Sequence, residues 1–110
     1  MSLVTHVFES HKRIQNGVVV SHDSVPRRAN FDYDPTGSVV DITIITTLST
    51  KRAYLTRQDG FTLYYRGDDP DYRFELECWP DNGTIKRFSV FRDDTGVEYR
   101  YISSHQDRMW

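Results

Sequence analysis

The sequence predicts a mainly β protein, an antiparallel up-and-down meander of about eight strands that forms a curved sheet or a small barrel. Three observations support this class. Apolar and polar residues alternate along several short runs, as in half-buried strands. Glycines preceded by polar residues open many of these runs, at positions 17, 37, 60, 83 and 96. Residues 38–48 concentrate Val, Ile and Thr, which is typical of a central strand.

The composition is that of one ordinary domain covering residues 1–110. A chain of this length buries about two-thirds of its unfolded surface, so it needs no disulfide or metal to fold. The net charge of −2 argues against nucleic acid as the main partner. No apolar run is long enough to span a membrane, and no secretory signal is visible. The single cysteine, Cys78, cannot form an internal disulfide and fits a reducing compartment, so we expect a cytoplasmic protein. No cofactor is predicted.

Residues 1–16 are compatible with either a helix or a strand. A helix capped by Gly17 is favoured by the spacing of Val4, Val7, Phe8, His11 and Ile14. Against it, Val4, Thr5 and Val7 are poor helix formers. The alternative is a hairpin in which residues 15–17 form the turn before a strand at 17–23. We favour one N-terminal helix followed by that strand.

The middle of the chain is expected to form hairpins around Gly37 and Gly60. A two- or four-residue loop before residue 38 sets Phe31 opposite Ile42, which the apolar pattern favours. The central strand is expected to turn at Ser49 and Thr50 into a strand at 52–57. A three-residue turn at 58–60 then pairs Leu55 with Leu63 and Ala53 with Tyr65, and places Phe61, Leu63 and Tyr65 on one face.

Residues 71–103 predict three strands joined by two three-residue turns. In the first hairpin this register opposes Leu76 to Phe88, Phe74 to Val90, Glu77 to Arg87 and Trp79 to Ile85. A similar turn closed by Gly96 opposes Arg92 to Glu98, Phe91 to Tyr99 and Phe88 to Ile102. The two faces of this meander are named here. Face A is apolar and carries Phe61, Leu63, Tyr65, Tyr72, Phe74, Leu76, Cys78, Phe88, Val90 and Ile102. Face B is aromatic and charged and carries Tyr54, Thr62, Tyr64, Arg73, Glu75, Glu77, Trp79, Ile85, Arg87, Phe91, Tyr99 and Tyr101.

No arrangement of residues indicates catalysis or a metal site. His6, Glu9 and His11 do not converge in either a helix or a strand. The acidic cluster of Asp68, Asp69 and Asp71 is interpreted as a solvated turn. Glu75 and Glu77 are interpreted as ion-pair partners of nearby arginines. Cys78 reads as a small buried apolar residue. We therefore assign no enzymatic activity.

Face B is the candidate site, because protein interfaces are enriched in aromatic residues and arginine. The chain is predicted to bind a protein partner, or a second copy of itself, as an inhibitor, adaptor or accessory subunit. The predicted binding residues are Tyr54, Tyr64, Arg73, Glu75, Trp79, Arg87, Phe91, Tyr99 and Tyr101.

Three other functions are weighed against this one. The first is a small barrel that binds an apolar small molecule among Phe61, Leu63, Phe74, Phe88 and Val90. The second is a platform for single-stranded nucleic acid, which ranks lower because Glu75 and Glu77 would repel phosphate. The third is an enzyme that uses Arg92, Glu98 and Arg100 at a barrel mouth. Its only support is that these charged residues are close together in the sequence. Residues 104–110 are expected to form a flexible tail.

Overall fold

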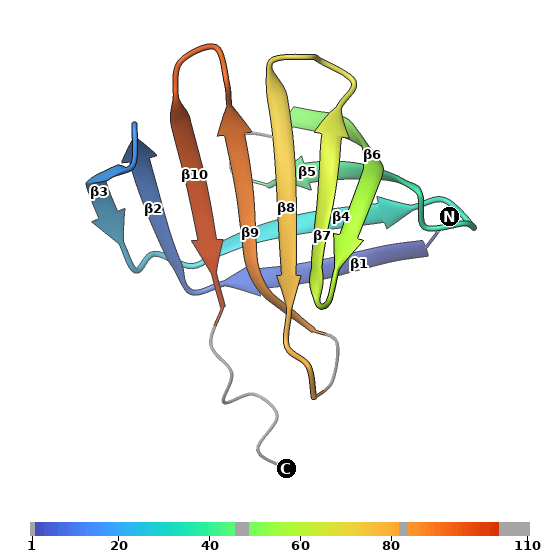
Figure 1. The fold of residues 1–110 in the computed structure, drawn as a ribbon. Coiled ribbons are helices and arrows are strands. Elements are labelled where there is room, and N and C mark those ends of the chain that lie inside the picture. The colour runs from blue at the N-terminus through green and yellow to red at the C-terminus, as the bar shows by residue number, and fades with distance from the viewer. Residues whose placement is uncertain (1, 46–48, 82–83, 104–110) are drawn as a thin grey trace.

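The computed structural model describes residues 2–45, 49–81 and 84–103. These residues form a single antiparallel sheet of ten strands and no helix, so none of them lies in a helix able to cross a membrane (Figure 1). The strands are β1 (Ser2–Phe8), β2 (Ser10–Gln15), β3 (Val18–Asp23), β4 (Arg27–Tyr33), β5 (Val39–Ile44), β6 (Ser49–Asp59), β7 (Thr62–Gly67), β8 (Tyr72–Cys78), β9 (Ile85–Arg92) and β10 (Val97–Ile102). The predicted tail at 104–110 lies outside the described residues.

The sheet curls into a half-barrel, because β1, β4 and β5 cross behind β7–β10 (Figure 1). Its strand order is β1-β4-β5-β6-β7-β8-β9-β10-β2-β3. β1 and β2 are separated only by Glu9, yet β1 pairs with β4 and β2 pairs with β10. The backbone N–H of Glu9 donates to the carbonyl of Ile102 at 2.9 Å. Residues 2–15 therefore join the two ends of the β4–β10 meander.

The predicted N-terminal helix is wrong, and the alternative hairpin forms with a turn of two residues, 16–17, instead of the turn expected at 15–17. Asn16 and Gly17 have φ values of 50° and 84° and separate Gln15 from its partner Val18. Two consecutive residues with positive φ make the turn whose twist matches a two-residue hairpin. The β-branched residues of β1 pair with β4 instead of forming a helical face, which brings the strand number to ten.

Two of the predicted registers are confirmed. Phe31 faces Ile42 in the β4–β5 pair. In the β8–β9 pair, Leu76 faces Phe88, Phe74 faces Val90 and Glu77 faces Arg87. Both hairpins place apolar side chains on the side of the sheet that becomes the core.

The predicted β9–β10 register is wrong by one residue. Arg92 pairs with Val97, so the loop contains four residues, 93–96. The N–H of Gly96 donates to the carbonyl of Arg92 at 2.9 Å, and Gly96 has a φ of 71°, so the loop is a single helix-like turn ended by a left-handed glycine. A one-residue slip reverses the faces of a strand. Tyr99 and Tyr101 consequently face Val90 and Phe88 on face A, and Ile102 lies on face B.

Two further turns differ from the prediction. A bulge between Glu77 and Cys78 sets Ile85 opposite Cys78, and Ile85 is buried in the core instead of lying on face B. In the β6–β7 hairpin Asp59 pairs with Thr62, so Phe61 lies in a two-residue turn and is 54% exposed.

The β6 strand also departs from its predicted start and pairing. A bulge near residue 56 opposes Leu55 to Tyr65 and Ala53 to Gly67, so the predicted pairing of Leu55 with Leu63 and of Ala53 with Tyr65 is wrong. β6 already begins at Ser49, so the turn predicted at Ser49 and Thr50 is wrong as well.

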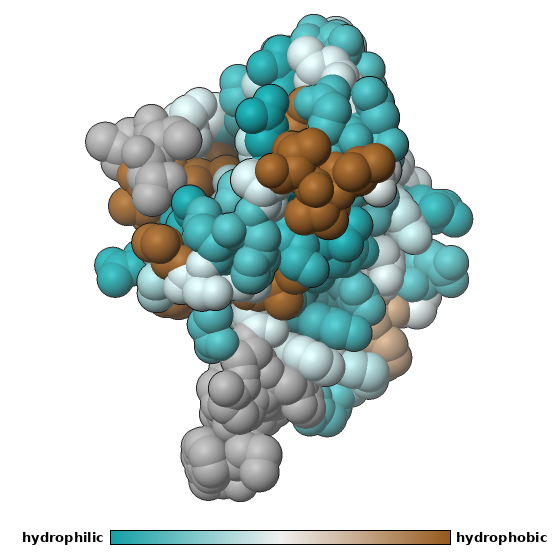
Figure 2. Space-filling view, turned by 90° about the vertical axis from the view of Figure 1, so that its left-hand side faces the viewer, coloured by the Kyte–Doolittle hydropathy of each residue, from teal (hydrophilic) through white to brown (hydrophobic). Residues whose placement is uncertain are grey.

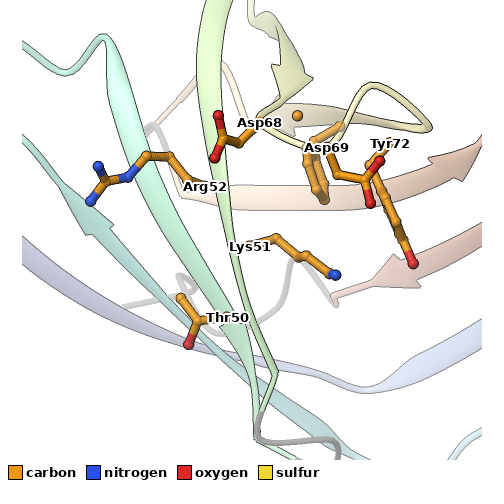
Figure 3. A pocket seen from close by; sticks show the side chains of 8 residues that line it. Thr50, Lys51, Arg52, Asp68, Asp69 and Tyr72 are labelled. Atoms are coloured by element: carbon orange, nitrogen blue, oxygen red, sulfur yellow. The ribbon is translucent and has the colours of Figure 1, made fainter.

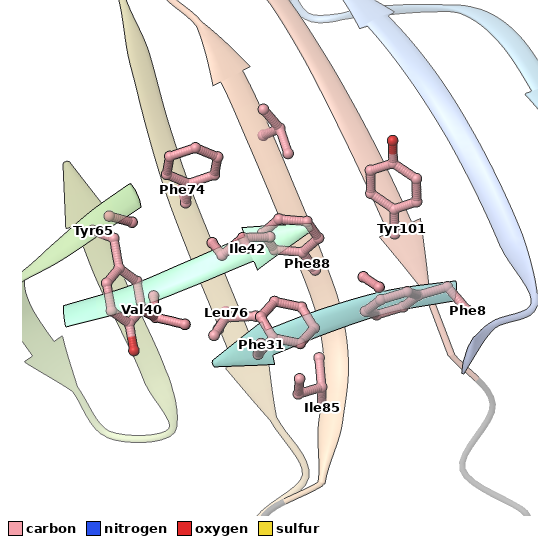
Figure 4. Packing of buried hydrophobic residues seen from close by; sticks show 13 residues of the cluster. Phe8, Phe31, Val40, Ile42, Tyr65, Phe74, Leu76, Ile85, Phe88 and Tyr101 are labelled. Atoms are coloured by element: carbon pink, nitrogen blue, oxygen red, sulfur yellow. The ribbon is translucent and has the colours of Figure 1, made fainter. Parts of the chain in front are cut away.

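The core lies between the crossing layers, and Phe88 is at its centre (Figure 4). The Phe88 ring is fully buried. Its centroid lies 5.2 Å from that of Phe31 and 6.1 Å from that of Phe8, which belong to one layer. It lies 6.2 Å from that of Phe74 and 5.7 Å from that of Tyr101, which belong to the other. One aromatic cluster therefore holds the two layers together.

Candidate ligand hollow and outer sheet face

Face B is the convex, outer face of the half-barrel, and the core lies on the other side of the sheet. It brings together seven of the nine predicted binding residues: Tyr54, Tyr64, Arg73, Glu75, Trp79, Arg87 and Phe91. The placement of Tyr99 and Tyr101 on this face is wrong, since both side chains point inward and Tyr101 is buried. Among the described residues no element covers face B.

A basic side chain stacks on each aromatic ring of face B. Arg57 lies over Tyr64 at 4.1 Å from the ring centroid and Arg66 over Tyr54 at 4.6 Å. The same arrangement recurs twice more, with Arg73 over Phe91 at 4.3 Å and Lys86 over Trp79 at 4.9 Å. Neither Arg57 nor Arg66 was singled out in the sequence. Arg57 lies seven residues from Tyr64 and Arg66 lies twelve residues from Tyr54 in the sequence. Both pairs sit across a hairpin whose bulge in β6 a sequence pattern does not reveal.

The centre of face B is a network of ion pairs around a buried serine. Arg87 binds Glu75 at 3.3 Å and Glu77 at 3.1 Å, in agreement with the interpretation of both carboxylates as ion-paired. The hydroxyl of Ser89 accepts a hydrogen bond from Arg87 at 2.7 Å and donates one to Glu98 at 2.8 Å. Partial burial by itself raises the pKa of Glu98, but hydrogen bonds from Arg100 and Ser89 outweigh it and leave the pKa below its ordinary value.

The inner side of the sheet contains a half-open hollow of about 360 Å³ between the two layers. We call it the interlayer hollow. Its floor is apolar, with Ile42, Phe74, Phe88 and Val90 all buried. The remaining lining residues are Ile44, Ser49, Lys51, Tyr72, Arg92, Tyr99 and Tyr101. Strands β5 and β6 supply one wall, and β8–β10 supply the other.

Two cations stand at the rim of the interlayer hollow, around the ring of Tyr72. Nζ of Lys51 lies 4.7 Å from the ring centroid, and the guanidinium of Arg92 lies 5.2 Å from it. Figure 3 shows Lys51 extending from β6 toward Tyr72, beside an adjoining hollow of about 150 Å³ that both residues share. Arg92 binds Asp94 at 2.8 Å through Nη2. Its Nε is buried and has no hydrogen-bond partner among the described residues.

The predicted ligand-lining residues are only partly brought together. Phe74, Phe88 and Val90 line the interlayer hollow, whereas Phe61 is exposed in its turn. Leu63 lines a second hollow of about 530 Å³, which also contains His6 and Cys78. Burial and the nearby carboxylate of Glu77 raise the pKa of the Cys78 thiol, which keeps it protonated and disfavours a role as nucleophile.

The arginine and glutamate proposed for a barrel mouth are not neighbours. Arg92 lies at the interlayer hollow, but Glu98 and Arg100 point to face B and bind each other at 2.8 Å. In the acidic turn, Asp69 accepts a hydrogen bond from the backbone N–H of Asp71 at 3.0 Å. Across the described part of the chain, no three His, Cys, Asp or Glu side chains are grouped so that they could hold a metal ion.

The edge of the sheet formed by β3 is apolar. Among the strands that the structure describes, β3 pairs only with β2, and Val18, Val19 and Val20 are 64%, 51% and 54% exposed. Figure 2, which faces this side, shows apolar residues surrounded by hydrophilic ones. His11 lies nearby, 3.8 Å from Asp23 and with its ring 4.8 Å from that of Tyr101. Burial and the adjacent Arg27 lower the pKa of His11, although Asp23 opposes this shift.

Comparison with known proteins places the chain in no family: no family model matches it, and neither does any curated protein.

Proposed function

We propose that this protein binds a small amphipathic molecule that has an apolar body and an anionic end. The observation that carries the proposal is the interlayer hollow, which combines a buried apolar floor with two cations at its rim. Ligand sites in proteins share this composition, with mostly apolar walls and a few polar groups that fix the orientation of the ligand.

The volume of the interlayer hollow suits a small ligand. At about 360 Å³ it lies at the lower end of the range of ligand pockets. An apolar cavity of about 150 Å³ holds one benzene, and the same ratio gives room for about 14 non-hydrogen atoms here. A ten-carbon carboxylate falls within that size.

The charges at the rim favour an anion. No carboxylate of the described residues forms an ion pair with Lys51, which lies over the electron-rich face of Tyr72. The unpartnered Nε of Arg92 offers a further donor, since a guanidinium can bind Asp94 and a ligand carboxylate with different N–H groups. Burying the apolar body and pairing its charge at the rim would together hold such a ligand.

The proposal is tested by calorimetric titration with decanoate, decanol and decylamine, which share one apolar body and differ in charge. We expect decanoate to bind best and decylamine worst. The Lys51→Gln/Arg92→Gln double variant should remove the advantage of decanoate over decanol. An Ile44→Trp variant, which fills the hollow from its partly buried wall, should weaken both of these ligands.

The matched control is Arg13→Gln/Arg28→Gln, which removes two exposed cations from elsewhere on the chain. This control variant should bind decanoate, decanol and decylamine in the same order and with the same affinities as the wild type. Equal binding of all three ligands, or binding that survives Ile44→Trp, would refute the interlayer hollow as the site.

A second candidate function is protein binding through face B. It is supported by the aromatic and arginine side chains of this uncovered face, several of them partly exposed. The test is affinity purification from the native host with wild-type protein and with Tyr64→Ala/Phe91→Ala, which leaves the core intact. Loss of one identified partner with retained folding supports this function, and size-exclusion chromatography shows whether that partner is a second copy. A cytoplasmic location stays a prediction.

A further inference from the structure

We propose that face B binds an acidic peptide segment of a protein partner, at a hollow of about 250 Å³ between β6, β7 and β8. We call it the arginine hollow. Its wall contains the side chains of Arg57, Arg66 and Arg73 against a single acidic one, Glu75. The inference rests on the second candidate function above and names the chemistry of that partner.

Two of these arginines are not neutralised within the described residues. Arg57 and Arg66 are exposed, and each stacks on a tyrosine ring without an ion pair to a carboxylate. Glu75 is already held by Arg87 at 3.3 Å and lies 3.7 Å from Arg73. The hollow therefore presents a local positive charge on a protein whose net charge is −2.

The pairing of the strands adds a second argument. Arg66 and Arg73 are direct cross-strand partners in the β7–β8 pair. Like charges in this position destabilise a sheet. Asp93 compensates the charge of Arg73 by accepting two hydrogen bonds of 2.8 and 3.1 Å from it. The described residues offer no such carboxylate to Arg66. A carboxylate bound between them would supply it.

The surroundings favour a short acidic segment over a nucleic acid. The tyrosines under Arg57 and Arg66 hold the guanidinium planes in place, which leaves their N–H edges free for bidentate contacts to carboxylates. A nucleic-acid strand needs a basic track along its whole backbone. Beyond the hollow, face B instead carries Glu77 and Glu98 on β8 and β10.

Fluorescence anisotropy with the whole protein tests this inference. The probes are fluorescein-labelled hexaglutamate, hexalysine and an oligothymidylate of equal length. Hexaglutamate should bind with an affinity that falls as salt rises, and hexalysine should not bind. Arg57→Gln/Arg66→Gln should weaken hexaglutamate binding by about tenfold or more, the effect of losing two charge-assisted contacts.

Two controls keep the result specific. Arg13→Gln/Arg28→Gln makes the same change in net charge and should leave the affinity for hexaglutamate within about a factor of two. Arg57→Lys/Arg66→Lys keeps the charge but loses the planar fork, and should bind more weakly than wild type. Circular dichroism establishes that each variant is folded.

Three outcomes would overturn the inference: equal loss of binding in both Gln double variants, tighter binding of the oligothymidylate than of hexaglutamate, or no binding of hexaglutamate. The titration needs no native partner. Its failure therefore removes only the acidic chemistry, while the purification with Tyr64→Ala/Phe91→Ala decides separately whether face B binds protein.

Discussion

Replacing Phe88 with alanine is expected to remove most of the stability of the fold. The Phe88 ring is fully buried and lies within 5.2–6.2 Å, centroid to centroid, of four other aromatic rings. Because those rings come from both layers, neither layer can move into the vacated space without losing its contacts with the other. We therefore place the loss near the upper part of the usual range for Phe→Ala in a core, about 3–5 kcal/mol.

The expected loss is large relative to the whole stability of a small domain, which is about 5–15 kcal/mol. With a urea m value of about 1.5 kcal/mol per molar, it lowers the unfolding midpoint by about 2–3 M. Urea unfolding followed by tryptophan fluorescence and by circular dichroism measures it. The milder Phe88→Leu variant keeps the measurement possible if the alanine variant does not fold.

The matched control is Phe91→Ala, in the same strand but on face B. Phe91 packs under the guanidinium of Arg73 and is partly exposed. Its loss is expected to destabilise the protein by about 1 kcal/mol. Equal destabilisation by Phe88→Ala and Phe91→Ala would contradict the assignment of the two faces of β9, and with it the placement of the core.

Four further predictions concern stability and solubility. Gly67→Ala should destabilise by about 1–3 kcal/mol in urea unfolding, because its Cβ would lie 2.8 Å from the carbonyl oxygens of Asp69 and Tyr72. Ser89→Ala should lose about 1–2 kcal/mol by the same assay, since Arg87 and Glu98 lose their shared partner. The hydrogen bonds from Arg27 hold the pKa of Asp23 at about 2, below its ordinary 3.8. This ion pair therefore stabilises the fold above about pH 4, and its contribution is lost as the pH falls toward 2. In the Asp23→Asn variant, the melting temperature should vary less between about pH 4 and pH 2 than in the wild type. Val19→Lys should slow aggregation on heating, measured by turbidity, because a charge on an exposed edge strand hinders edge-to-edge pairing.

The sequence predicts the class of the fold and the β8–β9 register, because alternation in both strands leaves one pairing that segregates Phe74 and Phe88 from Glu77 and Arg87. It fails at the next turn, because a Gly after three polar residues closes either a three- or a four-residue loop. The decisive signal lay in β10 itself. Val97, Tyr99 and Tyr101 alternate with Glu98 and Arg100, whereas Ile102 and the pairing of Arg92 with Glu98 favour the opposite orientation.

Neither candidate site could be derived fully from sequence. The predicted face B was right for Arg73 and Arg87, which strand parity fixes once the register is known. The sequence does not decide whether face B is covered, because alternation along a strand does not show which other strands pack against that face. The interlayer hollow depends on that relation. Lys51 reaches Tyr72 only because the sheet curls until β6 faces β8.

The segment that joins β1 to β2 also constrains how the chain can fold. β1 finds its partner β4 soon after both are made, but β2 pairs with β10 near the other end of the chain. The side chain of Gln15 donates to the carbonyl of Thr95, 80 residues away in sequence. Contacts this distant form slowly, because a long loop must close first. On the ribosome, the β2–β3 hairpin would therefore emerge early, and its β2 edge would stay open until β10 is synthesised. Among the described strands, the valine-rich β3 edge stays open in the folded sheet as well.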